Sequence, residues 1–339
     1  MTRVLLTGGS GFIAAHVLET LLKRGHSVVT TVRSQAKADK IKEAHPEASS
    51  SNLSFAIVED IAQPGAFDEA IKSDPPFEAV IHTASPFHFN VTDVQKQLLD
   101  PAIIGTTGIL KSIKKSAPTV KRVVITSSFA AIVNPSRGAW PGHTYSEADW
   151  NPISTSEAVE NPANGYRASK TFAERSAWDF VSSEKPNFDI ATINPPFVFG
   201  PVVHYLNSLD ALNTSNQRIG AMVTGSCGKT IPPVGTGIWV DVRDVAEAHV
   251  KAMEVGEAGG KRFFITEGFY DNVEMVEVIK KHFPDLAEKL PTEVGEGAEL
   301  PKEIFKIDNS RGKEILGLKY RGFEECIRDT VESVKPFLK

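Results

Sequence analysis

Cysteine is scarce in this 339-residue sequence, where Cys227 and Cys326 are the two thiols. Two cysteines so far apart give neither a disulfide framework nor the ligand spacing of a zinc site. The nine histidines form no H-x-x-x-H pattern, so we expect no metal ion. Apolar runs stay well below the length of a membrane span, and a strand-like segment stands where a signal peptide would be. The sequence therefore predicts a reduced, cytoplasmic protein without a membrane partner.

A strong excess of charge of either sign is also absent. The sequence has 37 basic and 42 acidic residues, which gives a net charge of −5. A slightly acidic balance argues against binding to nucleic acid or to a membrane surface. The length and the 41% apolar content allow one large or two small domains with a substantial core.

A glycine-rich turn lies near the start of the chain, between a predicted strand at 3–7 and a predicted helix at 16–23. Gly9-x-Gly11-x-x-Ala14 has the spacing of a dinucleotide-binding loop. Glycines let backbone amides approach a pyrophosphate, which then lies at the positive end of the helix. A glycine turn without a ligand is the alternative. We interpret these residues as the cofactor loop: Gly8, Gly9, Ser10, Gly11, Phe12 and Ile13.

Strands alternate with helices over the first part of the chain. Further predicted strands span 27–32, 52–58, 78–83, 122–126 and 189–193. Predicted helices cover 98–114, starting at Asp100-Pro101, and 162–183, capped by Asn161. This alternation predicts an α/β fold with a doubly wound parallel Rossmann sheet and a smaller C-terminal substrate lobe. We expect the Rossmann domain at 1–200, joined by 238–256, and the smaller lobe at 201–237 and 257–339. The long connections at 134–160 and 201–236 are expected to enclose the substrate.

A tyrosine and a lysine are placed one helical turn apart at positions 166 and 170. Residues four apart share a helix face, so a fixed ammonium lies beside the phenol of Tyr166. A positive charge there favours the phenolate, which suits the pair for proton exchange with an alcohol oxygen. The strand at 122–126 ends in Ser127-Ser128, at the sheet edge where ligands bind. A serine at this edge can donate a hydrogen bond to a carbonyl while Tyr166 supplies the proton.

The end of the second predicted strand indicates which cofactor the loop binds. NAD-binding proteins typically carry an acidic residue there, whereas this sequence has Arg33, with Lys37 one turn later. A guanidinium binds a 2′-phosphate through paired hydrogen bonds, and a carboxylate would repel it. We therefore expect NADPH/NADP+ as the cofactor. A solvated basic pair at a helix start is the alternative.

Taken together, these segments resemble the extended short-chain dehydrogenase/reductase superfamily over essentially the full length. The resemblance is closer to fungal NADPH-dependent methylglyoxal and carbonyl reductases, and looser to plant dihydroflavonol reductases. It is carried by Tyr166 and Lys170 and by the segments 7–14, 31–34, 82–87, 124–128, 194–201 and 240–246.

The resemblance implies roles that spacing alone does not give. Ser128 is expected to be the catalytic serine, and Lys170 to hold the nicotinamide ribose as well. Implied cofactor contacts are Asp60 and Ile61 at the adenine, Thr83 near the ribose, Val198 at the carboxamide and Ser215 from the second lobe. Implied walls of the substrate pocket are Phe87, Phe129 and Phe197, for which ordinary core positions are the alternative. Many members also use a helix asparagine, and residues 102–105 contain none.

The sequence therefore predicts NADPH-dependent reduction of aldehydes and ketones, with Tyr166 as the general acid. Ser128 would polarise the carbonyl, and Lys170 would lower the pKa of the tyrosine. One alternative is a nucleotide-sugar epimerase or dehydratase, although Ser128-Phe-Ala-Ala lacks the carboxylate that a dehydratase needs. Another is a sensor that binds NADPH without chemistry. The expected partner is a small carbonyl compound, and the expected state a monomer or homodimer.

Overall fold

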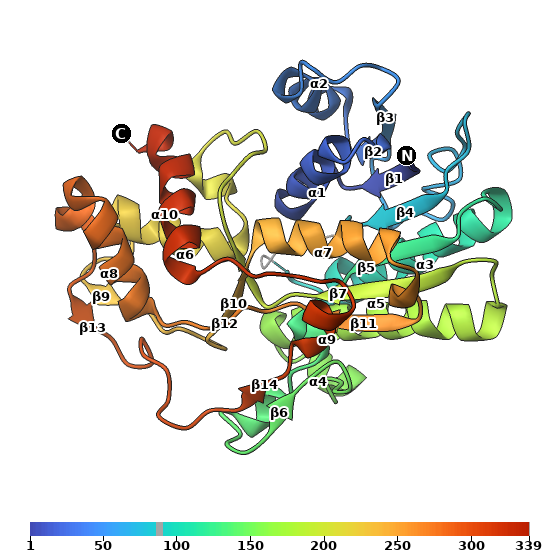
Figure 1. The fold of residues 1–339 in the computed structure, drawn as a ribbon. Coiled ribbons are helices and arrows are strands. Elements are labelled where there is room, and N and C mark those ends of the chain that lie inside the picture. Colours follow the sequence, from blue (N-terminus) through green and yellow to red (C-terminus); the bar gives the residue numbers. More distant parts are fainter. Residues whose placement is uncertain (86–90, 339) are drawn as a thin grey trace.

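A parallel sheet forms the centre of the protein in the computed structural model, which describes residues 1–85 and 91–338 (Figure 1). Seven strands lie in the order β3-β2-β1-β4-β5-β7-β11, and every neighbouring pair is parallel. They are β1 (Arg3–Thr7), β2 (Ser27–Val32), β3 (Leu53–Ile57), β4 (Ala79–His82), β5 (Arg122–Thr126), β7 (Asp189–Asn194) and β11 (Lys261–Phe264). The predicted doubly wound sheet is confirmed.

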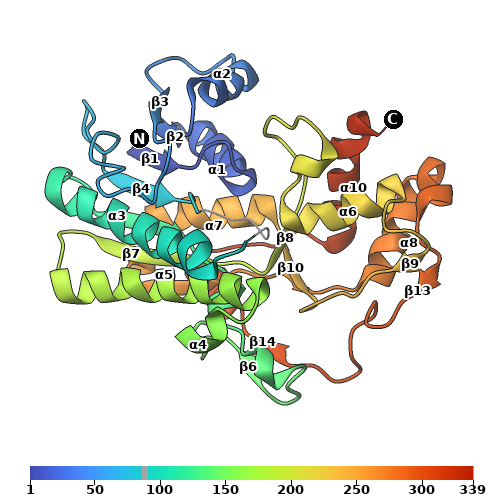
Figure 2. The same ribbon diagram turned by 180° about the vertical axis from the view of Figure 1, so that it is seen from behind.

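Helices cover both faces of this sheet. α1 (Phe12–Lys23) and α7 (Val242–Glu254) pack together on one face, and α3 (Asp100–Ser116) and α5 (Pro162–Glu184) on the other (Figures 1 and 2). α2 (Gln35–Ala44) follows β2. Successive strand side chains point to opposite faces, so Val4 belongs to the cluster under α1 and α7 and Leu5 to the other cluster. Burial on both faces explains why these strands are apolar runs.

A second, smaller lobe has its own sheet and its own apolar core. β8 (Phe197–Phe199), β10 (Ile238–Asp241) and β12 (Gly268–Phe269) form a three-stranded sheet in the order β12-β10-β8. Trp239 and Tyr270 are buried in a cluster that also contains residues of α6 (Thr214–Thr224), α8 (Asn272–His282) and α10 (Phe323–Val334). These helices lie together beside the large sheet (Figure 1).

The large-sheet part and the smaller lobe alternate along the chain more often than the predicted domain boundaries allow. α7 contacts α1, β5 and β7, whereas β10, directly before it, pairs with strands of the small sheet. β11 is an edge strand of the large sheet, although the sequence placed all of 257–339 in the smaller lobe. This strand was not predicted from the sequence because it begins with the charged residues Lys261 and Arg262. Arg262 tolerates burial because its Nε donates a hydrogen bond of 2.6 Å to Glu174.

The connections that were expected to enclose the substrate contain short elements. In the connection 134–160 these are η3 (Pro135–Arg137), β6 (Thr144–Tyr145) and α4 (Thr155–Ala158), and in 201–236 they are η4 (Leu209–Ala211) and β9 (Thr230–Ile231) together with α6. The short elements elsewhere are η1 (Gln95–Leu99), η2 (Phe129–Ala131), η5 (Gly256–Ala258), η6 (Pro284–Lys289), β13 (Glu293–Val294), β14 (Lys306–Ile307), α9 (Ser310–Glu314) and η7 (Lys335–Phe337). Among the residues described, no helix is both long enough and apolar enough to cross a membrane.

Candidate active site

A cavity of about 750 Å³ lies where β1, β5 and β7 end. It brings together predicted residues that are far apart in the sequence. Those that line it are Gly8, Gly11, Phe12, Ile13, Thr83, Ser128, Phe129, Tyr166, Lys170, Phe197, Val198 and Ser215. The predicted cofactor loop and the predicted catalytic residues therefore share one space.

The glycine loop has the shape that a bound pyrophosphate requires. Gly8 has φ +77°, and a Cβ there would lie 3.0 Å from the backbone of Ala84. A Cβ on Gly9 would lie 2.1 Å from Oγ1 of Thr30, so Gly9 supports the loop from behind while Gly8 and Gly11 line the cavity. α1 begins directly after Gly11, and the first residues of this helix, Phe12 and Ile13, line the cavity. A helix N terminus with a glycine cradle fits the diphosphate of a dinucleotide.

Ser128 is held just after the end of β5 by a nearby backbone amide and by a side chain from β7. Its Oγ accepts a hydrogen bond from the amide of Ala130 at 3.1 Å, and its carbonyl accepts one from Asn194 at 3.3 Å. The hydroxyl of the adjacent Ser127 donates to the buried carboxylate of Glu174. Both serines line the cavity, but the hydroxyl of Ser127 is committed to this carboxylate, whereas that of Ser128 has a long hydrogen bond of 3.5 Å to the carbonyl of Pro195.

Tyr166 lies in the first half of α5, whose N-cap Asn161 accepts a hydrogen bond from the amide of Asn164 at 2.9 Å. The phenol of Tyr166 shares a hydrogen bond with Ser128. Burial raises the pKa of Tyr166, and the hydrogen bond with Ser128 opposes this rise. The structure thus corrects the expectation that the charge of Lys170 sets this pKa. A neutral phenol at pH 7 is the form that donates a proton.

Lys170 reaches into the same region one turn further along α5. Its Nζ donates a hydrogen bond of 3.0 Å to Oγ of Ser85. Burial lowers the pKa of Lys170 to about 8, so the ammonium form still dominates at neutral pH. Ser85 was quoted within the segment 82–87 but was given no role, although it is the hydroxyl that contacts this ammonium.

A small polar chamber of about 20 Å³ lies behind Lys170. Its walls include His82, Ser85, Thr106 of α3 and Glu174. His82 Nδ1 lies 2.8 Å from Oγ1 of Thr7, and its Nε2 has no hydrogen-bond partner within the described residues. Burial, with a smaller effect of the Lys170 charge, lowers the pKa of His82 to about 3. The neutral imidazole of His82 and the side chain of Thr106 therefore lie near Lys170. Residues 102–105 supply no asparagine for this purpose.

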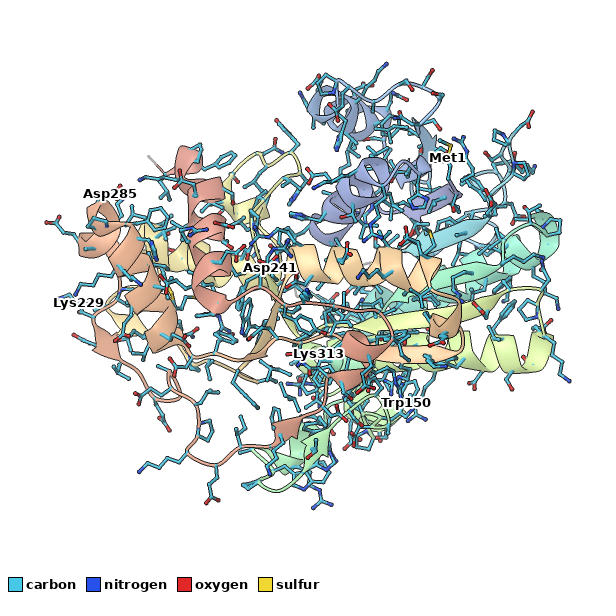
Figure 3. The ribbon with its side chains drawn as sticks, in the orientation of Figure 1. Met1, Trp150, Lys229, Asp241, Asp285 and Lys313 are labelled. Carbon is cyan, nitrogen blue, oxygen red and sulfur yellow. The ribbon has the colours of Figure 1, made fainter. Side chains whose placement is uncertain are left out.

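Glu174 organises the polar groups beneath the site, and the sequence reasoning missed it. Its carboxylate accepts hydrogen bonds from Ser127, Thr192, Asn194 and Arg262. The guanidinium carbon of Arg262 also lies 3.7 Å from the ring centroid of Trp150, the residue labelled in Figure 3. The spacing 166, 170, 174 is one helical turn at each step, which is the signal that would have indicated it.

Several predicted cofactor residues lie outside the cavity. Arg33 and Lys37 are exposed at the end of β2 and in the first turn of α2. Asp60 follows β3, and hydrogen bonds from Gln63 and Ala62, with the charge of Arg33, lower its pKa. The remaining three are Gly9 and Ser10, within the glycine loop, and Ile61, whose Cδ1 would lie 3.0 Å from a Cβ on Gly105. Phe87 lies outside the described residues.

The predicted aromatic walls differ in their surroundings. Phe129 is buried and stacked on Phe264 at 5.0 Å between ring centroids, so it serves the core as well as the cavity. Phe197 is only partly buried and has the guanidinium of Arg218 5.0 Å from its ring centroid. The connection 201–236, which was expected to enclose the substrate, also contributes wall residues that were not named individually, namely Leu212, Asn213, Thr214, Gln217 and Thr236. Within this wall, the amide of Val198 donates a hydrogen bond of 3.1 Å to Ser215.

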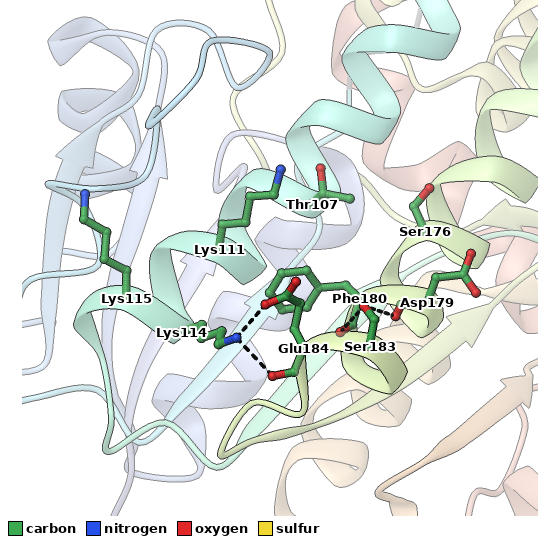
Figure 4. Close-up of a pocket in the computed structure, with 9 residues that line it drawn as sticks. All are labelled: Thr107, Lys111, Lys114, Lys115, Ser176, Asp179, Phe180, Ser183 and Glu184. Carbon is green, nitrogen blue, oxygen red and sulfur yellow. Dashed lines mark hydrogen bonds and ion pairs between the residues drawn. The ribbon is translucent and has the colours of Figure 1, made fainter.

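A second hollow of about 580 Å³ lies between α3 and α5, and contains none of the predicted catalytic residues (Figure 4). Lys111, Lys114 and Lys115 line it, and Lys114 is paired with Glu184 at 2.6 Å. Solvated charges of this kind do not form a catalytic site. The described residues also contain no group of three or more histidine, cysteine or acidic side chains that could hold a metal ion.

Fold and cavity together define a dinucleotide-binding α/β protein with a serine just after β5 and a tyrosine and a lysine on α5. Residues 4–265 match the NAD dependent epimerase/dehydratase family, and the chain belongs to this family.

Relatives and solved structures match nearly the whole chain. The ketoreductase azaE of Aspergillus niger is 46% identical over 336 residues, which cover 98% of this chain and 97% of the relative. The NADPH-dependent methylglyoxal reductase GRE2 of Saccharomyces cerevisiae is 36% identical, with 98% of each chain covered. The crystal structure of yeast methylglyoxal/isovaleraldehyde reductase Gre2 complexed with NADPH gives a TM-score of 0.90 at 35% identity, covering 99% of this chain and 98% of that chain. The similarity therefore extends over both lobes.

Proposed function

We propose that the protein reduces aldehydes and ketones to alcohols with NADPH. The observation that carries the proposal is the shared cavity, in which the hydrogen-bonded pair Ser128 and Tyr166 lies beside the glycine loop. The names of the similar ketoreductase and methylglyoxal reductase support the same reaction.

Ser128 and Tyr166 would act on the carbonyl oxygen in different ways. NADPH, when bound, supplies the hydride for the carbonyl carbon. Ser128 donates a hydrogen bond to the oxygen, and the neutral phenol of Tyr166 gives it the proton. General acid catalysis of this kind typically contributes ~10²–10⁴-fold. Lys170 supplies a positive charge one helical turn away.

The choice of NADPH over NADH rests on the end of β2. Arg33 is exposed there, with no acidic residue in the first turn of α2. A 2′-phosphate would meet the guanidinium of Arg33 and the ammonium of Lys37, both of which attract it. The relative GRE2 is named as NADPH-dependent, which supports this choice. Cytoplasmic location and a monomeric or homodimeric state remain predictions.

A spectrophotometric screen of cofactor oxidation tests the proposal. The panel contains methylglyoxal, diketones, aryl ketones and β-keto esters, each with NADPH and with NADH. We expect turnover of at least one carbonyl class and a lower KM for NADPH. The family also includes epimerases and dehydratases, so UDP-sugars are assayed without added cofactor. Turnover of a UDP-sugar together with inactivity towards every carbonyl would contradict the proposal.

A further inference from the structure

Arg167 lies directly beside the predicted general acid and lines the same cavity. It is partly buried, and neither the reaction nor the cofactor cradle uses it. Its Nη1 donates a hydrogen bond of 3.2 Å to the side-chain amide of Asn164. Within the part of the chain that the structure describes, this is the polar partner recorded for its guanidinium.

The cavity has a charge imbalance that Arg167 helps to create. Its two charged wall residues are Lys170 and Arg167, and none of its described wall residues is acidic. No carboxylate within the described residues lies within 4.0 Å of Arg167, in contrast to Arg262, which is paired with Glu174. A guanidinium offers several N–H donors, and partial burial without an anion is unfavourable. An anionic group on a ligand would remove this imbalance.

The position of Arg167 on α5 indicates which end of a substrate it would meet. Ala163, Tyr166 and Arg167 line the cavity from the first turns of this helix, with Val133 also in the wall. The carbonyl oxygen must lie against the hydroxyls of Ser128 and Tyr166. The rest of a substrate can then extend towards the guanidinium.

We propose that Arg167 is a specificity-determining residue that binds the carboxylate of an oxo acid, whose carbonyl is the reacting group. This inference rests on the proposed carbonyl reduction. A planar carboxylate matches a guanidinium through two parallel hydrogen bonds, which an ammonium cannot reproduce. Neutral carbonyl compounds remain substrates, but they leave the guanidinium without an anion.

Three matched pairs of an oxo acid and its methyl ester test the inference: pyruvate, acetoacetate and 4-oxopentanoate. Each pair keeps its ketone and removes the negative charge. For each pair, the ratio of kcat/KM for the acid to kcat/KM for the ester is measured in wild type and in Arg167→Gln. We expect this ratio to be about 10- to 100-fold lower in Arg167→Gln for at least one pair, which corresponds to the loss of a hydrogen bond to a charged group. The loss should appear mainly in KM for the acid, and Arg167→Lys should retain an intermediate ratio.

Arg175 provides the matched control on the same helix. It is exposed, it lies 4.7 Å from the ring centroid of Trp150, and it is not among the residues that line the cavity. Arg175→Gln removes the same charge and should leave every ratio unchanged. Added salt should raise KM for the favoured acid in wild type and not in Arg167→Gln.

Two results would overturn the inference. One is an acid-to-ester ratio that is the same in wild type and Arg167→Gln for all three pairs. The other is an equal loss of acid and ester turnover in Arg167→Gln, which would assign Arg167 to folding or to the reaction itself. Failure of the proposed function looks different, because wild type would then reduce neither acids, esters nor methylglyoxal with NADPH.

Discussion

The two walls of the cavity are built in different ways. On the side of the large sheet, Ser128 and Lys170 stand on a strand end and a long helix, above the buried carboxylate of Glu174. On the side of the smaller lobe, the wall consists of a short strand with Phe197 and of residues around the start of α6, such as Asn213 and Gln217. The first wall fixes the reacting groups, whereas the second surrounds whatever carbonyl compound is bound.

This difference indicates which residues can be substituted to change function without loss of the fold. Groups that act on a reacting bond need rigid support, and buried hydrogen-bond networks provide it. Exposed wall residues such as Gln217 have few partners, so substitutions there should alter substrate choice at low cost in stability.

The largest expected effect is on stability, through Glu174. Glu174→Gln leaves the buried guanidinium of Arg262 without its anion, which typically costs about 3–5 kcal/mol. Denaturant unfolding should show this loss. Gln217→Ala in the other wall is the control, with an expected change within about 0.5 kcal/mol. Equal changes in the two variants would contradict the distinction between the walls.

The next effect concerns the cofactor. Arg33→Ala should raise KM for NADPH about 10- to 100-fold, because a hydrogen-bonded charge pair is lost, and leave KM for NADH nearly unchanged. Lys37→Ala should act in the same direction with a smaller factor, since an ammonium offers no paired hydrogen bonds. Steady-state kinetics with both cofactors measures this. An equal rise in KM for NADPH and for NADH would show that Arg33 does not bind the 2′-phosphate.

A smaller effect follows from the lowered pKa of Lys170. Burial favours the neutral amine, so the positive charge is present below pH about 8 and is lost as pH rises through that value. The rate of carbonyl reduction should therefore decline above pH about 8, by up to about tenfold per unit. Lys170→Arg keeps its charge at these pH values and should lack this decline, whatever its absolute rate. A wild-type profile that stays flat to high pH would contradict the assignment.

The smallest effect belongs to Phe197. Phe197→Leu removes ring surface from the wall formed by the smaller lobe, which should raise KM for aryl ketones by about fivefold, the equivalent of about 1 kcal/mol of apolar contact. Turnover of methylglyoxal, which is too small to fill the wall, should stay nearly the same. A drop in kcat for both substrates would place Phe197 with the reacting groups.

Sequence reasoning succeeded where a local pattern decides the structure. β1, β2 and β5 have the predicted bounds because burial on both faces of the sheet gives each of them a continuous run of mainly apolar and β-branched residues. The cap at Asn161 follows from its side-chain oxygen and the proline after it. α3 begins at Asp100 with Pro101 in its first turn, as expected, but the helical segment η1 that precedes it from Gln95 was not predicted.

What sequence reasoning missed depends on tertiary neighbours. β11 was not predicted because the burial of Arg262 requires Glu174, which is distant in sequence. The pKa of Tyr166 was expected to fall through Lys170, but burial raises it. No sequence pattern says that Arg167 faces the cavity, because the residue after Tyr166 points about 100° away on an ideal helix.

The proposed reaction depends on the phenolic proton of Tyr166, and Tyr166→Phe keeps the ring while it removes this proton. NADPH binding is measured by fluorescence and carbonyl reduction by NADPH oxidation, both on the same preparation. We predict unchanged binding with turnover reduced by ~10²–10⁴-fold. Near-normal turnover in this variant would contradict the account.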